Sequence, residues 1–135
     1  MLVKSLRSGQ PISDAYIAAK QVIDSRAKDN LQYHSSFGFG IGTQFKEDLL
    51  QINAKNNKTV EPGMVFHCRI TLTGVSKETS RSVVGIGDTV YIGQDGSAVV
   101  LTSAIQKRYN DISYSLDDDE QDQPAKPEPK QAKPA

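Results

Sequence analysis

Apolar residues recur at helical spacing near the start of the chain. Over residues 14–28 they occupy positions 15, 18, 19, 22 and 23, which fall on one face of an α-helix. Ser13 lies two positions after Pro11, and a serine is a favourable N-cap there. The sequence therefore predicts one amphipathic helix that begins after Ser13 and buries one face.

The pattern becomes that of β-strands after Gly38. Four segments are rich in Val, Ile, Leu, Phe and Thr, and turn residues separate them, over residues 48–54, 64–75, 82–93 and 98–102. A short, weakly alternating element follows over residues 105–116. One helix followed by strands predicts an α+β fold, in which a long helix covers a curved antiparallel sheet. A chain of 135 residues allows one domain at most.

Composition divides the chain at residue 117. From that position onward there is no Val, Ile, Leu, Phe or Tyr, whereas four of the six prolines lie there. Such a segment buries too little apolar surface to offset the entropy of ordering it. We therefore predict a folded unit over residues 1–116 and a disordered, acidic and proline-rich linker or tail over residues 117–135.

Charge and cysteine content exclude some classes of protein. Lys plus Arg and Asp plus Glu both number 16, so net charge does not favour attraction to nucleic acid or to a membrane surface. No apolar run approaches the roughly 20 residues that span a bilayer. Cys68 is the only cysteine. An intramolecular disulfide is therefore excluded, which is typical of a reducing compartment.

The segment GFGIGTQFKE, residues 38–47, carries three alternating glycines. It is neither a dinucleotide-binding fingerprint nor a Walker loop, because its spacing is G-x-G-x-G and no Lys-Ser/Thr pair closes it. The alternation favours a kinked strand, or a place where another backbone approaches closely. His34 and His67 have no metal-ligand spacing. Glu47 and Asp88 are possible carboxylate partners, although nothing in the sequence alone brings them together.

Three segments in order resemble the second half of the pita-bread fold of methionine aminopeptidases, prolidases and creatinases: GFGIGTQFKE, PGMVFHCRI and GIGDTVYIGQDGSAVVLTS. The resemblance implies that residues 1–116 are the C-terminal half of an aminopeptidase-like domain, incomplete in this chain. In those enzymes one His and two Glu of these segments help to hold a metal pair that activates water. The corresponding positions are Phe39, Arg69 and Gly87, and a second enzyme histidine corresponds to Lys46. The resemblance thus implies that metal, cofactor and peptidase activity are all absent.

A narrower resemblance follows from INAKN, residues 52–56, before GMVF, residues 63–66. Together with the entry helix and the closing strands, these segments resemble the N-terminal aminopeptidase-like domain of the large subunit of the FACT histone chaperone. The resemblance implies a non-catalytic, histone-binding module in the nucleus, acting on chromatin when nucleosomes are reorganised during transcription, replication and repair. Its partners would be core histones and, through domains absent here, a smaller HMG-box-type subunit, with DNA contacted only indirectly and no membrane.

Binding residues are predicted at two places. Residues around the former metal site are candidates for contact with histones or peptides, namely Lys46, His67 and Arg69. The acidic run of the tail is the second candidate, with Asp117, Asp118, Asp119 and Glu120. Three alternatives stay open: these residues only pack against or solvate the sheet, the chain is a peptide-binding pseudoenzyme unrelated to chromatin, or it is an enzyme of the aminopeptidase and prolidase class.

Overall fold

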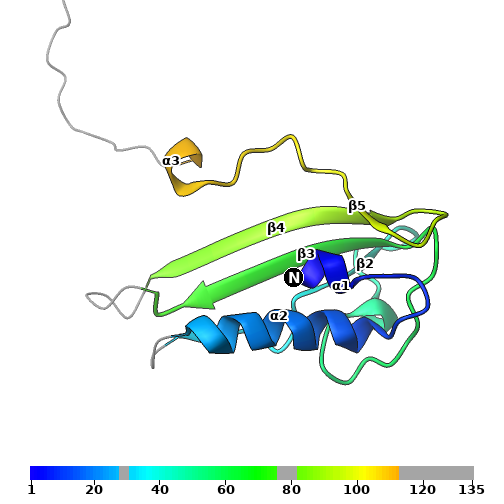
Figure 1. The fold of residues 1–135 in the computed structure, drawn as a ribbon, viewed down its shortest axis with the longest axis horizontal. Coiled ribbons are helices and arrows are strands. Elements are labelled where there is room, and N and C mark those ends of the chain that lie inside the picture. Colours follow the sequence, from blue (N-terminus) through cyan, green and yellow to red (C-terminus); the bar gives the residue numbers. More distant parts are fainter. Residues whose placement is uncertain (28–30, 76–81, 113–135) are drawn as a thin grey trace, which may run out of the picture.

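The computed structural model describes residues 1–27, 31–75 and 82–112 (Figure 1). The chain forms one antiparallel sheet with α1 and α2 on one face. The elements, in chain order, are α1 Leu2–Ser5, α2 Ile12–Arg26, β1 Gln32–Tyr33, β2 Gly38–Ile41, the 3-10 helix η1 Asp48–Leu50, β3 Val65–Thr73, β4 Val83–Ile92, β5 Ala98–Val100 and α3 Tyr109–Ile112.

The centre of the sheet is the long pair β3 and β4, which hydrogen-bond along the whole of β3. On the other edge of β3, β1 pairs with its end and β2 with its beginning, and β5 pairs with β4. The strands predicted over residues 64–75, 82–93 and 98–102 are therefore confirmed. Within the weakly alternating segment 105–116, the described residues contain the short helix α3.

The predicted long helix is confirmed as α2, but the prediction of Ser13 as its N-cap is wrong. The N-cap is Pro11, and Ser13 lies inside the first turn, where it is buried. The amides of Ile12 and Ser13 donate to the carbonyl oxygens of Lys58 and Asn56, both at 2.9 Å. A distant loop thus satisfies the first amides of the helix, so that no side-chain cap is needed.

The predicted strand over residues 48–54 is wrong. Its first part is η1, and only Asn53 forms an isolated bridge, to Ser36. The Asn56 side-chain amide donates to the carbonyl oxygens of Leu49 at 3.1 Å and Gln51 at 2.7 Å. These bonds curl the backbone into a compact loop, and asparagine favours such turns over extended strand.

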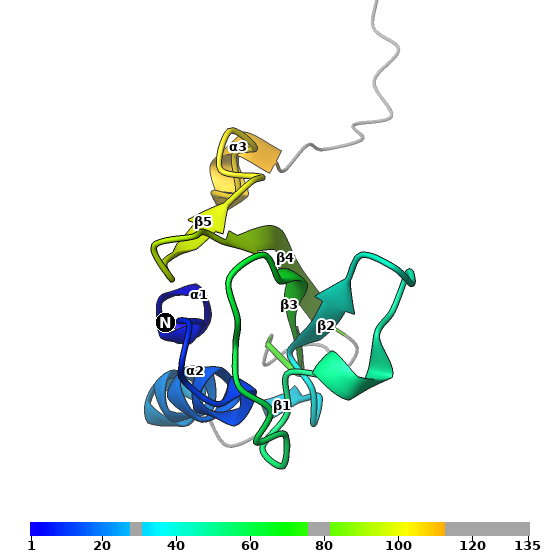
Figure 2. The ribbon, with the colours of Figure 1, turned by 90° about the vertical axis from the view of Figure 1, so that its right-hand side faces the viewer.

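The hydrophobic core lies between the helices and the sheet. Figure 2 shows α1 and α2 together on one side of the β3–β4 pair. The Tyr16 ring of α2 stacks on Phe37 with 4.5 Å between ring centroids, and Phe66 of β3 and Val90 of β4 are fully buried beneath them. The predicted architecture, a long helix covering an antiparallel sheet, is confirmed by this arrangement.

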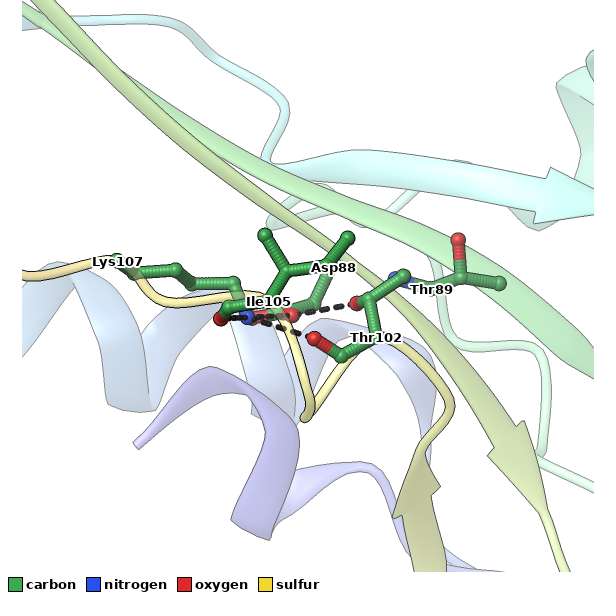
Figure 3. A network of polar contacts seen from close by, with 5 residues as sticks. All are labelled: Asp88, Thr89, Thr102, Ile105 and Lys107. Carbon is green, nitrogen blue, oxygen red and sulfur yellow. Dashed lines mark hydrogen bonds and ion pairs between the residues drawn. The ribbon is translucent and has the colours of Figure 1, made fainter. Parts of the chain in front are cut away.

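A polar network holds the segment after β5 against β4 (Figure 3). The Asp88 carboxylate accepts a hydrogen bond from the Thr102 hydroxyl at 2.6 Å and pairs with Lys107 Nζ at 2.7 Å. Partial burial disfavours the charged carboxylate, but hydrogen bonds from Lys107 and Thr102 and the charge of Lys107 outweigh it. The pKa of Asp88 therefore lies below its ordinary value.

The predicted boundary after residue 116 and the tail 117–135 lie outside the described residues.

Candidate functional site

The glycine-rich segment begins as β2, and its first glycine is required by a close backbone contact. Gly38 has φ +136°, and a Cβ at this position would lie 2.1 Å from the carbonyl oxygen of His67 on β3. No side chain fits there without moving the backbone. The prediction that this segment is a strand closely approached by another backbone is therefore confirmed.

Strand register brings the three positions that the resemblance assigns to enzyme metal ligands onto one face of the sheet. Phe39 of β2 lies opposite His67 of β3, and Arg69 of β3 lies opposite Gly87 of β4. Opposite residues in antiparallel strands share a face, as do His67 and Arg69, which are two positions apart. Cys68 between them points the other way and is buried on the face that carries the helices. The positions thus converge on the face away from α1 and α2, called the open face below.

A cleft of about 440 Å³ lies on the open face. Its lining includes His34, Phe39, Lys46, Gln51, Arg69 and Thr71. We call it the open-face cleft. Of the binding residues predicted from the sequence, it brings together Lys46 and Arg69.

A bulge between β1 and β2 lies beside the cleft. Tyr33 faces Leu72 and Gly38 faces Cys68, so five steps along this edge match four steps along β3. The four residues 34–37 therefore lie opposite only three residues of β3, at positions 69–71. Bulges bend a strand and often lie next to functional sites. Here the bulge delivers His34 and Ser36 to the cleft wall.

Aromatic and charged side chains meet at Phe39. Its ring centroid lies 5.3 Å from that of His67, and Lys46 Nζ lies 5.9 Å from the Phe39 centroid. Lys46 also approaches the exposed carboxylate of Asp48 at 3.6 Å. His67 therefore borders the same cluster, although it is not among the side chains that line the cleft.

The other chemistry predicted from the sequence stays dispersed. Glu47 bridges to Gly40 through its backbone, whereas Asp88 is engaged by Thr102 and Lys107, so the two carboxylates are not a pair. Within residues 1–27, 31–75 and 82–112, no three His, Cys, Asp or Glu side chains gather closely enough to hold a metal ion. In the same ranges no helix has the length and apolarity that crossing a bilayer requires.

The buried thiol is not among the described residues that line the cleft. Burial, reinforced by the nearby Asp88 carboxylate, raises the pKa of the Cys68 thiol to about 12, so the thiol stays protonated and unreactive. The acidic candidates Asp117, Asp118, Asp119 and Glu120 lie outside the described residues.

Sequence reasoning missed the contribution of Gln51, Thr71 and Gly85 beside the cleft. The alternating glycines at 85 and 87 of β4 were the available signal for an open surface.

Known proteins resemble this chain at two levels. Residues 1–94 match the family model of Metallopeptidase family M24. FACT complex subunit SPT16 from Zea mays is 32% identical over 124 residues, which cover 87% of this chain and 12% of the maize protein. The chain thus corresponds to a small part of the curated relative that it matches.

Solved structures agree with this. The N-terminal domain of FACT complex subunit SPT16 from Cicer arietinum matches with a TM-score of 0.70 and 34% identity, over 84% of this chain and 28% of that one. Prolidase from Pyrococcus furiosus matches with a TM-score of 0.65 and 21% identity, over 79% of this chain and 29% of that one. The predicted second half of a pita-bread fold is confirmed, as is the predicted resemblance to the N-terminal domain of the large FACT subunit.

Proposed function

Because this chain belongs to metallopeptidase family M24 and resembles the N-terminal domain of FACT complex subunit SPT16, we propose that it is part of a FACT-type histone chaperone subunit. The single observation that carries this proposal is the 34% identity to the chickpea SPT16 domain, against 21% to prolidase at a comparable TM-score. In this role the chain is a non-catalytic binding module, acting in the nucleus when nucleosomes are reorganised in transcription, replication and repair.

The proposed loss of peptidase activity rests on side-chain chemistry. Phe39 has no lone pair, Gly87 has no side chain, and Arg69 carries a permanent positive charge that repels a metal ion. These residues do not fit the metal pair that the enzymes of this family use. We therefore propose that the module works without metal or cofactor.

The proposed partners are core histones. Residues 1–116 would form the domain, and the acidic run at 117–120 within the tail 117–135 would supply a salt-sensitive share of the attraction to basic histones. Lys46, His67 and Arg69 remain proposed contacts for a peptide. Contact with a smaller HMG-box-type subunit is proposed for parts of the longer relatives that this chain does not cover, and contact with DNA would be indirect.

Histone binding by the 135-residue chain tests this function. Core histones are titrated at low and moderate salt against the chain and against a variant in which Asp117, Asp118 and Asp119 become Asn and Glu120 becomes Gln. Modest binding is expected, with a loss in the neutralised variant that is greater at low salt. The matched control for this variant neutralises the same number of carboxylates elsewhere, at Asp14, Asp29, Glu61 and Asp111, all outside the acidic run.

The enzymatic alternative is tested on the same protein. Mn²⁺ and Co²⁺ are titrated by calorimetry, and dipeptide cleavage is followed with each metal. Neither stoichiometric metal uptake nor cleavage is expected. Metal-dependent cleavage without histone binding at either salt concentration would contradict the chaperone proposal and indicate an active peptidase.

A further inference from the structure

The open-face cleft combines two positive side chains with a lining free of acidic ones. No Asp or Glu is among the described residues that line it. Lys46 approaches one carboxylate, that of Asp48 at 3.6 Å, and this pair is exposed, with 49% and 79% of the side chains accessible. Such pairs contribute little. Arg69 forms no ion pair or hydrogen bond through its guanidinium with any described residue. Both cations are therefore available to an anionic ligand.

The strand beside Arg69 offers bare backbone on this face. A Cβ added at Gly85 would lie 3.7 Å from Arg69 Nη2 and 3.5 Å from Thr71 Oγ1, and one added at Gly87 would lie 3.5 Å from His67 Cε1. The guanidinium thus lies next to a floor without side chains. Glycines in a strand interior often mark a place where a ligand or another backbone comes close.

We propose that the open-face cleft binds a peptide segment in an extended conformation through a carboxylate. The planar guanidinium of Arg69 donates two parallel hydrogen bonds to the two carboxylate oxygens. Lys46, on the neighbouring wall of the cleft, adds electrostatic attraction to the same carboxylate. The glycine floor at residues 85 and 87 lets the peptide backbone lie against β4. The ring of Phe39 provides an apolar surface beside the charged groups.

Charge sets the class of ligand. A lysine-rich segment would bring like charges against Lys46 and Arg69, which disfavours binding. An acidic segment, or the free carboxyl end of a chain, brings the opposite charge. The ligand is therefore opposite in charge to a basic histone tail, and the cleft does not need the chaperone function proposed above in order to operate.

Fluorescence anisotropy with the 135-residue chain tests the proposal. The main probe is a short fluorescein-labelled peptide of alternating Asp and Ser, blocked at both ends, and its counterparts carry Asn or Lys in place of Asp. The Asp peptide is expected to bind at low salt, and the other two are not. A second arm uses a neutral peptide with a free carboxyl end. Binding of the blocked Asp peptide identifies side-chain carboxylates as the source, and binding of the second identifies a chain terminus. Failure of both would overturn the proposal.

Four variants connect the binding to the cleft. Arg69→Gln is expected to weaken binding about tenfold, the effect of one charge-assisted hydrogen-bonded contact. Lys46→Gln is expected to weaken it less, because its ammonium is a point charge without the fork. Gly85→Val fills the floor without changing any charge and is also expected to weaken binding. Arg26→Gln, on the exposed last turn of α2, removes an equal charge on the other side of the sheet and serves as the control.

Circular dichroism and thermal melting check that each variant is folded. If Gly85→Val unfolds the chain, Gly85→Ala replaces it, since its Cβ meets only ordinary contacts. Equal affinity for the Lys peptide, equal losses in Arg26→Gln and Arg69→Gln, or full affinity in the folded Gly85 variant would each overturn the proposal. Histone titration tests the proposed chaperone function, whereas peptide anisotropy tests the cleft. Failure of histone binding would therefore not change the result of the peptide experiment.

Discussion

Removing the cation that neutralises Asp88 is expected to destabilise the fold at neutral pH. In Lys107→Met, the carboxylate loses its ion pair at 2.7 Å and keeps only the Thr102 hydroxyl at 2.6 Å. The side chains of Lys107 and Asp88 are 29% and 20% exposed, so this pair lies between exposed pairs and fully buried ones. A charge-assisted hydrogen bond in that setting contributes about 1.5 kcal/mol to the free energy of unfolding. The melting temperature should fall by roughly 6 °C for a domain of this size.

The effect should depend on pH in a defined direction. The folded-state pKa of Asp88 lies below its ordinary value, so the carboxylate stabilises the fold above about pH 4 and loses that contribution as pH falls through the folded pKa. Lys107→Met removes part of what lowers this pKa. The difference in stability between the two proteins is therefore largest near pH 7 and shrinks on acidification. Urea unfolding followed by circular dichroism at pH 7, 5 and 3.5 measures it.

An exposed pair on α2 provides the matched control. Lys20 bonds to Asp24, both side chains are 45% exposed, and Asp24 also accepts a hydrogen bond from the Tyr33 hydroxyl at 2.6 Å. Lys20→Met thus leaves its carboxylate with one hydroxyl donor, as Lys107→Met does, but in solvent. Little change is expected. Equal losses in the two variants, or a Lys107→Met loss that persists undiminished at pH 3.5, would refute the assignment of stability to the Asp88 network.

Three further predictions concern the fold. Gly38→Ala should destabilise the chain far more than Gly63→Ala, because both glycines have positive φ but only at Gly38 would a Cβ meet the His67 carbonyl oxygen, at 2.1 Å; similar melting temperatures would contradict this. Cys68 should resist iodoacetamide at pH 8 in the native chain and react once guanidinium unfolds it, since burial raises the pKa of its thiol to about 12. Limited proteolysis should remove residues 117–135 first, and a tail that survives longer than the folded part would disprove the predicted disorder.

The parts of the fold that depend on local pattern were predictable from the sequence. Long runs of β-branched and aromatic residues gave the strands that became β3 and β4, and helical spacing gave α2. The segment at residues 48–54 looked equally apolar. It forms η1 instead of a strand because the Asn56 side-chain amide donates hydrogen bonds to two of its carbonyl oxygens. The start of α2 was misplaced because its amides bond to a distant loop. The second error comes from contacts that no local window contains, whereas the first comes from a side chain five to seven positions away whose hydrogen bonds the hydrophobic pattern does not report.

The candidate site was only partly predictable. Resemblance pointed to Phe39, Arg69 and Gly87 one at a time, and only strand register shows that they share the open face. The cleft beside them also needs the extra residue between Tyr33 and Gly38. Hydrophobic pattern carries no signal for a bulge of that kind, because a single inserted residue leaves composition and periodicity almost unchanged.

The way in which α2 begins has a consequence for how the chain folds. The Ser13 hydroxyl reaches the Asn57 side chain, 44 positions away, and the amides of Ile12 and Ser13 bond to carbonyl oxygens of the same loop. A helix of 15 residues is marginal in water on its own, so α2 cannot serve as an early, independent nucleus. Its first turn becomes secure only when the loop at residues 56–58 docks. Helix and loop therefore form one cooperative unit with a high contact order, which implies slow folding and amides in that first turn that exchange whenever the loop opens.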